Sequence, residues 1–169
     1  MRLLLGLVLT TLVTPTQAQA AAPDSIVFGN VRVSLGAPEQ SVLRALREYY
    51  DVSEVQDQFS ITRRGDKDAY EGFVSFRDGR VLSITKNWNL FLPNTQEALA
   101  RAVYGAFTKF GQSPAGCSVA TFDNEQPETQ KRGVVITCGQ RTVEIFTTRS
   151  VFGNRSVDVV VVNETLRGL

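Results

Sequence analysis

The first twenty residues constrain this chain most, because they determine which part of it folds and in which compartment. A short positive start, Met1-Arg2, precedes the mostly apolar run Leu3–Val13, and the small-residue stretch after it ends in the A-x-A pattern of Ala18–Ala20. This order is typical of a secretory signal peptide, cleaved after Ala20. A helix of that apolar run would span only about half of the ~30 Å hydrocarbon core. We therefore expect the mature protein, residues 21–169, to be periplasmic or extracellular, with no membrane span.

Residue types and charge exclude several classes of function. The chain contains no histidine, which excludes Ser-His-Asp and Cys-His catalysis, histidine-based zinc sites and haem bound through histidine. Loss of Arg2 with the leader leaves the 17 acidic residues balanced by equally many basic ones. A neutral chain argues against nucleic acid as the main partner. A chain of this size buries roughly 70% of its unfolded surface, so we expect it to fold without a metal or a cofactor.

Cys117 and Cys138 are the only cysteines. In an oxidising compartment, an isolated pair is expected to form a disulfide. Closing a loop of this length stabilises a fold by roughly 3 kcal/mol through chain entropy. Two free thiols, one of them reactive, are the alternative, but neither a C-x-x-C motif nor a histidine supports it.

The first half of the mature chain, about residues 26–92, has the pattern of a helix followed by an antiparallel meander. Residues 26–34 alternate as a strand or as a broken pair around Gly29-Asn30. An apolar stripe at helical spacing predicts a helix over Pro38–Tyr50, which ends at Asp51–Ser53. The strands expected after it are Gln58–Arg63, Tyr70–Arg77 and Arg80–Trp88.

The turn between the last two of these strands is Asp78-Gly79, and it allows two pairings. A two-residue turn pairs Phe76 with Val81, whereas a bulge at Gly79 pairs Phe76 with Arg80. We expect the bulged turn, because it gathers the large apolar residues on one buried face. That face would hold Val74, Phe76, Leu82 and Ile84.

The second half, about residues 93–169, repeats the order of a helix and then strands. Asn94 can cap a helix over Thr95–Phe110, and the polar residues Asp123–Arg132 suggest a loop between two strands. The buried stripe expected on the helix comprises Leu99, Ala102, Val103, Ala106, Phe107 and Phe110. The expected strands are Cys117–Phe122, Gly133–Cys138, Arg141–Arg149 and Ser156–Asn163.

Together these elements predict an α+β fold in a single domain. We expect an antiparallel sheet, or sheets, of about seven or eight strands with two helices packed on one face. The shared order of the two halves suggests a pseudo-duplicated architecture, although no residue-level repeat relates them.

The apolar segment between the halves holds the candidate binding residues Trp88, Leu90 and Phe91. If this segment is exposed, it is a binding hot spot, since tryptophan and other aromatic anchors dominate interfaces. If it crosses beneath the sheet, it fills the core between the halves. We favour the core position, because large apolar side chains are usually buried.

Two segments carry a resemblance to known envelope domains. Val33–Leu46 (VSLGAPEQSVLRAL) followed by Phe73–Ile84 (FVSFRDGRVLSI) resembles the fold shared by an outer-membrane assembly lipoprotein and the secreted β-lactamase inhibitor proteins. The chain departs from that pattern in lacking the lipid-anchor cysteine, the G-M-T turn before the helix and a second matching unit. The resemblance implies a small envelope binding module and assigns a role to no residue.

These observations predict a secreted or periplasmic protein that binds a protein or a cell-envelope component and is not an enzyme. Two alternatives stay open. One is a small carboxylate-dependent hydrolase of cell-wall or polysaccharide material, which needs two acidic side chains across a cleft, one of them with a raised pKa. The other is an inhibitor of a secreted hydrolase. The carboxylates spaced three apart, which we interpret as a solvated helix end, are Glu48, Asp51, Glu54 and Asp57.

Overall fold

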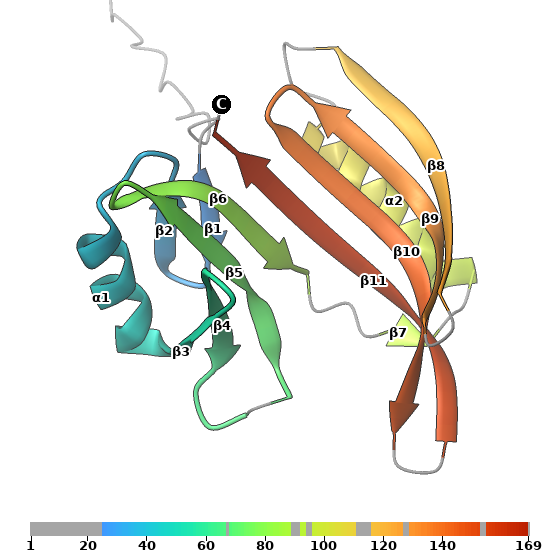
Figure 1. Ribbon diagram of the computed structural model, residues 1–169. Helices are drawn as coiled ribbons and strands as arrows, with labels where there is room; N and C mark the ends of the chain where they lie inside the picture. Colours follow the sequence, from blue (N-terminus) through green and yellow to red (C-terminus); the bar gives the residue numbers. More distant parts are fainter. Residues whose placement is uncertain are drawn as a thin grey trace, which may run out of the picture.

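One antiparallel sheet runs through the molecule in the computed structural model (Figure 1), which describes residues 25–66, 68–88, 92–93, 96–110, 116–126, 129–152 and 155–168. The expected leader, residues 1–20, lies outside these ranges. The strands in spatial order are β3 (Tyr50–Val55), β4 (Gln58–Arg63), β5 (Tyr70–Arg77), β6 (Arg80–Asn87), β11 (Arg155–Arg167), β10 (Arg141–Phe152), β9 (Thr129–Cys138) and β8 (Cys117–Gln126). A short strand, β7 (Leu92–Pro93), also pairs with β11.

Each half of the chain contributes a helix and then four of these strands. Helix α1 (Glu39–Tyr49) precedes β3–β6, and α2 (Gln96–Phe110) precedes β8–β11. The last strands of the two sets, β6 and β11, pair antiparallel with Thr85 opposite Thr165. The expected α+β class and the antiparallel meanders are therefore confirmed, and strands dominate the described part of the fold.

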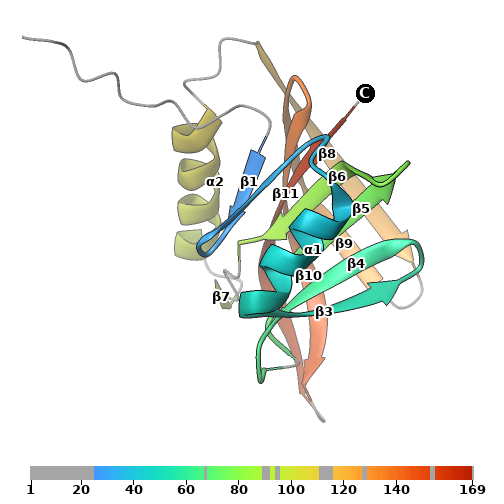
Figure 2. The ribbon, with the colours of Figure 1, turned by 90° about the vertical axis from the view of Figure 1, so that its left-hand side faces the viewer.

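The register of β11 shows that both cores lie on the same face of the sheet. Successive side chains of a strand point to opposite faces, so Val160, Val162, Glu164 and Leu166 share one face. Val160 and Val162 belong to the core beneath α2. Leu166 belongs to the core beneath α1 and the hairpin of β1 (Ser25–Phe28) and β2 (Val31–Ser34). In Figure 2, α2, β1 and α1 follow one another from left to right, with α2 and β1 to the left of the large sheet.

The Asp78-Gly79 turn corrects our expectation of a bulge at Gly79. Both residues have positive φ, 52° and 69°, as a two-residue type I′ turn requires, and Phe76 pairs with Val81. The register shifts one pair further on, so that Val74 lies opposite Ile84. The bulge therefore lies within β6, at Leu82. Val81 and Ile84 reach the buried face with Val74, whereas Leu82, which we expected there, is not part of this core.

Helix α2 packs on part of the stripe that we expected: Ala102, Ala106 and Phe110 are buried and Val103 packs against the same core, while Ala98 joins them on the buried side. Its buried residues recur every fourth position, at Ala98, Ala102, Ala106 and Phe110. Small alanine side chains let the helix approach the sheet closely, and this row is the one that faces it. As a result Leu99 and Phe107, which we expected to be buried, are 42% and 52% exposed.

Two further segments differ from expectation because polar residues fit an exposed strand as well as a loop. Residues 123–126 and 129–132 extend β8 and β9, and Arg132 Nε donates to Asp123 Oδ2 at 2.8 Å across the pair. At the other edge of the sheet, Asp51–Ser53 belong to strand β3 rather than to a helix end.

The expected disulfide joins the outermost strand to its neighbour. Cys117 lies directly opposite Cys138 on β9, and the sulfur atoms are 2.03 Å apart. Cys138 is buried in the core beneath α2, whereas Cys117 is exposed. The bond therefore anchors the edge strand to the packed part of the fold.

Replacing both cysteines, Cys117→Ala with Cys138→Ala, should lower the free energy of unfolding by roughly 3 kcal/mol, because the unfolded chain regains the entropy of an open loop. Urea unfolding followed by far-UV circular dichroism measures the change. Reduction of the unaltered protein should cause a similar loss and should leave the double variant unaffected. Equal stability of the oxidised protein and the double variant would contradict the prediction.

Candidate functional site

A fully buried carboxylate, Glu164, marks the seam between α2 and the β1–β2 hairpin. Glu164 lies on β11 between Val162, which faces α2, and Leu166, which faces the other core. Its side chain has no exposed surface. A buried carboxylate is costly unless it is paired and hydrogen-bonded, so its partners define the chemistry of the seam.

Three side chains from three different elements donate to Glu164. Arg141, from the start of β10, donates to Oε1 at 2.5 Å. Trp88, just after β6, donates its indole N–H to Oε2 at 3.0 Å, and Lys109 of α2 donates to the same oxygen. Arg141 also donates to the backbone carbonyl oxygen of Ser25 in β1 at 2.8 Å. The network therefore ties α2, the hairpin and the sheet together.

These donors keep Glu164 ionised. Burial acts to raise the pKa of Glu164, but the hydrogen bonds from Lys109 and Trp88 and the positive charges of Lys109 and Arg141 outweigh it, so that its pKa lies below the ordinary value. The carboxylate is thus a structural anion and not a proton donor at neutral pH.

A second lysine, Lys86, lies opposite Glu164 on β6. Its ammonium group donates to the carbonyl oxygen of Val27 at 2.5 Å and lies 5.8 Å from the centroid of the Phe28 ring. Burial, and then the charge of Lys109, lower the pKa of Lys86, while the charges of Glu164 and Glu71 act in the opposite direction. Lys86 is therefore a partly desolvated cation beside a second one.

The two lysines line one hollow, which we call the Trp88 pocket and which comprises Lys86, Trp88, Gly105 and Lys109. Its volume is about 410 Å³. The Lys109 ammonium lies 5.2 Å from the centroid of the Trp88 ring, and a Cβ at Gly105 would come within 3.3 Å of that ring. Glycine at this position of α2 thus lets the indole lie close against the helix.

A second buried carboxylate, Glu71 of β5, is paired with an exposed arginine. Arg63 donates to Glu71 Oε1 at 2.8 Å, and Glu71 is buried. Burial, and then the charge of Glu71, raise the pKa of the nearby Tyr50. Since Arg63 neutralises Glu71, the positive charge of Lys86 is not cancelled by an ion pair of its own among the described residues.

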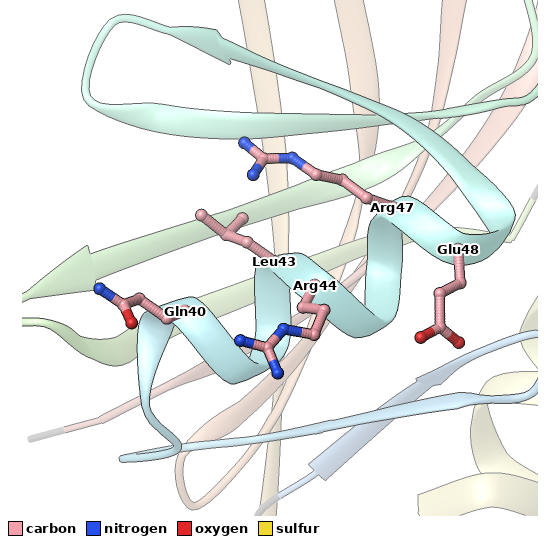
Figure 3. A pocket seen from close by; sticks show the side chains of 5 residues that line it. All are labelled: Gln40, Leu43, Arg44, Arg47 and Glu48. Atoms are coloured by element: carbon pink, nitrogen blue, oxygen red, sulfur yellow. The ribbon is translucent and has the colours of Figure 1, made fainter.

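A larger hollow of about 480 Å³ lies along α1 (Figure 3). The described residues that line it all belong to α1, and Figure 3 shows Leu43 and Arg47 extending toward the β3–β4 hairpin. Its charged side chains, Arg44, Arg47 and Glu48, are exposed. The charges of this hollow are solvated and lie on a single helix, so we favour the Trp88 pocket, where cations of β6 and α2 lie beside the buried Glu164.

Of the predicted binding residues, Trp88 is the one that the structure describes; Leu90 and Phe91 lie outside the described residues. The Trp88 ring is half-buried and packs against the core beneath α2, while its indole N–H reaches Glu164. Sequence analysis missed Lys86, Lys109 and Glu164. One signal for Glu164 was present in the sequence. It stands two residues from Val162 and from Leu166, so the strand alternation places its carboxylate on the same inward face as these apolar side chains.

Within the described residues, no helix is long and apolar enough to cross a bilayer. In the same part of the chain, no three Cys, Asp or Glu side chains cluster as a metal site would require.

Comparison with known proteins finds no family model that matches this chain and no significant match among curated proteins or solved structures.

Proposed function

We propose that this protein is a secreted or periplasmic binding protein, without enzymatic activity, that captures a protein or a cell-envelope component through an anionic group. The group is held in the Trp88 pocket. The disulfide between Cys117 and Cys138 supports a location in an oxidising compartment.

One observation carries the proposal: three cations meet one carboxylate at the seam. Lys86, Lys109 and Arg141 surround Glu164, which is shared between two of them. Lys86, which has no ion pair among the described residues, lines the pocket together with Lys109. A phosphate or carboxylate placed between them would gain charge-assisted hydrogen bonds in a partly desolvated setting.

Hydrolysis by paired carboxylates fits this site less well. A carboxylate pair needs one acid that stays protonated near neutral pH, whereas the pKa of Glu164 lies below its ordinary value. Glu71, the other acid that is buried in the described part of the chain, is paired with Arg63. The side chains that line the pocket are basic and aromatic, which favours binding.

Trp88 allows a direct test, because it is the only tryptophan in the chain and its fluorescence reports on the pocket. The purified exported protein is titrated with soluble peptidoglycan fragments, which carry carboxylates, and separately with lipopolysaccharide, which carries phosphates. We expect a saturable fluorescence change with one of them. Lys86→Met, which keeps the alkyl stem and removes the charge, should weaken that binding about tenfold or more.

The matched control is Lys131→Met. Lys131 also lies against an aromatic ring, 5.2 Å from the centroid of Phe146, but it is exposed and lies outside the pocket. Its loss should leave the affinity unchanged. The proposal fails if neither probe alters the fluorescence, or if the two lysine variants bind equally well.

A further inference from the structure

The two faces of the large sheet differ in what packs on them. Both cores lie on one face, against α1, α2 and the β1–β2 hairpin. Figure 1 looks onto the opposite face, which we call the outer face, and in Figure 2 α2 and β1 lie behind it, to the left of the strands. Side chains alternate along a strand, so the neighbours of the inward-pointing Val74, Ile84 and Leu166 belong to the outer face.

One continuous row of hydroxyl side chains crosses the outer face, and we call it the hydroxyl row. Thr85 of β6 lies directly opposite Thr165 of β11 on one side and Phe73 of β5 on the other. Followed from partner to partner in both directions, the row takes one residue from each of the strands β3, β4, β5, β6, β11, β10, β9 and β8. In that order its members are Ser53, Ser60, Phe73, Thr85, Thr165, Thr142, Thr137 and Ser118.

The hydroxyl row is accessible to solvent along its whole length. The serines at its two ends are exposed, and the residues between them are half-buried. Thr85 and Thr165 lie close enough for their Oγ1 atoms to share a hydrogen bond of 3.2 Å. Since a hydroxyl donates one hydrogen bond and accepts two, this central pair keeps hydrogen-bonding capacity for a ligand.

Strand formation alone does not account for the composition of the row. Threonine is favoured in strands because its side chain is branched at Cβ, but serine has no such branch, and Ser53, Ser60 and Ser118 are all members. Edge strands are usually protected by charges, whereas the row carries none, even where it ends on β3 and β8. An uncharged row of hydroxyls and one aromatic ring matches a ligand that is itself uncharged and rich in hydroxyl groups.

We propose that the hydroxyl row binds a single uncharged polysaccharide chain with β-1,4 linkages, which lies across the strands. Neighbouring strands are about 4.8 Å apart, which is close to the length that each sugar adds to such an extended chain. Successive sugars therefore meet successive hydroxyls, and the ring of Phe73 packs against the apolar C–H face of one of them. The row spans roughly 34 Å from β3 to β8, enough for about seven sugars.

The geometry favours this ligand over two other occupants of the outer face. Neighbouring strands are rotated by roughly 20–25°, so the row winds across the face and does not match the flat surface of a crystalline fibre. A charged polymer would find no opposite charge among the residues of the row. The proposal is independent of the Trp88 pocket, because Lys109 of α2 lines that pocket and α2 packs on the other face.

Isothermal titration calorimetry of the purified exported protein with two uncharged hexasaccharides, N-acetylchitohexaose and cellohexaose, tests the proposal. We expect saturable binding of at least one of them. The corresponding trisaccharide should bind at least tenfold more weakly, because the longer chain contacts more hydroxyls. Thr85→Val combined with Thr165→Val removes the central pair of hydroxyls together and keeps both branched side chains, and it should weaken binding of the hexasaccharide about tenfold.

The matched control is Thr121→Val combined with Thr147→Val. Thr121 lies opposite Val134, and Thr147 stands two residues from Ile145, so both share the face of the α2 core and not the outer face. This control should leave the affinity unchanged. The proposal is overturned if neither hexasaccharide binds at millimolar concentration, if chain length makes no difference, or if the two double variants bind equally well.

A charged chain provides a further test of the row. Polygalacturonate of the same length should bind more weakly than the better of the two hexasaccharides, and tighter binding would also overturn the proposal. The hexasaccharides carry no anionic group, so Lys86→Met should leave their binding unchanged. Because the fluorescence of Trp88 reports on the pocket and calorimetry with neutral sugars reports on the hydroxyl row, either proposal can fail alone.

Discussion

Replacing Glu164 with glutamine should lower the free energy of unfolding by about 3 kcal/mol or more. The amide keeps the shape of the side chain but removes its charge, which leaves Arg141 and Lys109 without their shared anion at a buried position. Breaking a buried pair by removing one partner typically costs 3–5 kcal/mol. The network also joins α2 to the hairpin through Arg141 and Ser25, so its loss loosens the seam between them.

Urea unfolding of Glu164→Gln at neutral pH measures this effect, and Glu97→Gln is its control. Glu97 accepts from Arg101 at 2.5 Å one turn along α2, but both side chains are exposed. Exposed pairs of this kind contribute about 0.5 kcal/mol or less. Similar losses in the two variants would show that burial does not strengthen the Glu164 network.

Glu164 should also make the fold sensitive to acid. Its folded-state pKa lies below the ordinary value of a glutamate, so it contributes stability that is fully present above that ordinary value. This contribution is lost as the pH falls through the folded-state pKa. Unfolding free energies measured from pH 6 downward should therefore fall less steeply for Glu164→Gln than for the unaltered protein. Parallel pH profiles would contradict the lowered pKa.

Gly72→Ala should be at least as damaging, by about 4 kcal/mol. Gly72 has a φ of +155°, and a Cβ there would lie 2.0 Å from the carbonyl oxygen of Thr85 and 3.0 Å from the Phe28 ring. The backbones of β5 and β6 must move apart to admit a methyl group, and overpacking combined with backbone strain produces losses of this size. The Phe28 ring also contacts Lys86, so the Trp88 pocket should be disturbed as well.

Gly79→Ala separates strain from steric overlap. Gly79 has a φ of +69° in the turn between β5 and β6, and nothing lies within 4 Å of its Cβ position. An L-residue there costs about 1–2 kcal/mol through its backbone conformation alone. Thermal unfolding should rank the unaltered protein first, Gly79→Ala second and Gly72→Ala last. Equal losses would mean that the close approach at Gly72 is tolerated.

Local patterns in the sequence determined most of the elements of this protein. The apolar stripe of α1, the Asp78-Gly79 turn and the alternation of the strands each depend on neighbouring residues, so these elements could be predicted. The disulfide could be predicted because the chain has only two cysteines and the leader suggests export to an oxidising compartment. Local patterns did not identify the strands whose residues are mostly polar and exposed. These are β3 and the outer parts of β8 and β9, where a helix end and a loop were expected.

Only the tertiary structure decided which face of α2 is buried and where the site lies. Helical spacing predicted a broad stripe that included both Ala102 and Leu99, and the tertiary packing turned only the side of Ala98, Ala102, Ala106 and Phe110 fully to the sheet. Lys86, Lys109 and Glu164 are far apart in the sequence and belong to three elements. They meet because β6 and β11 pair and α2 crosses above them, and a pairing of strands 80 residues apart in the sequence leaves no local pattern from which it could be predicted.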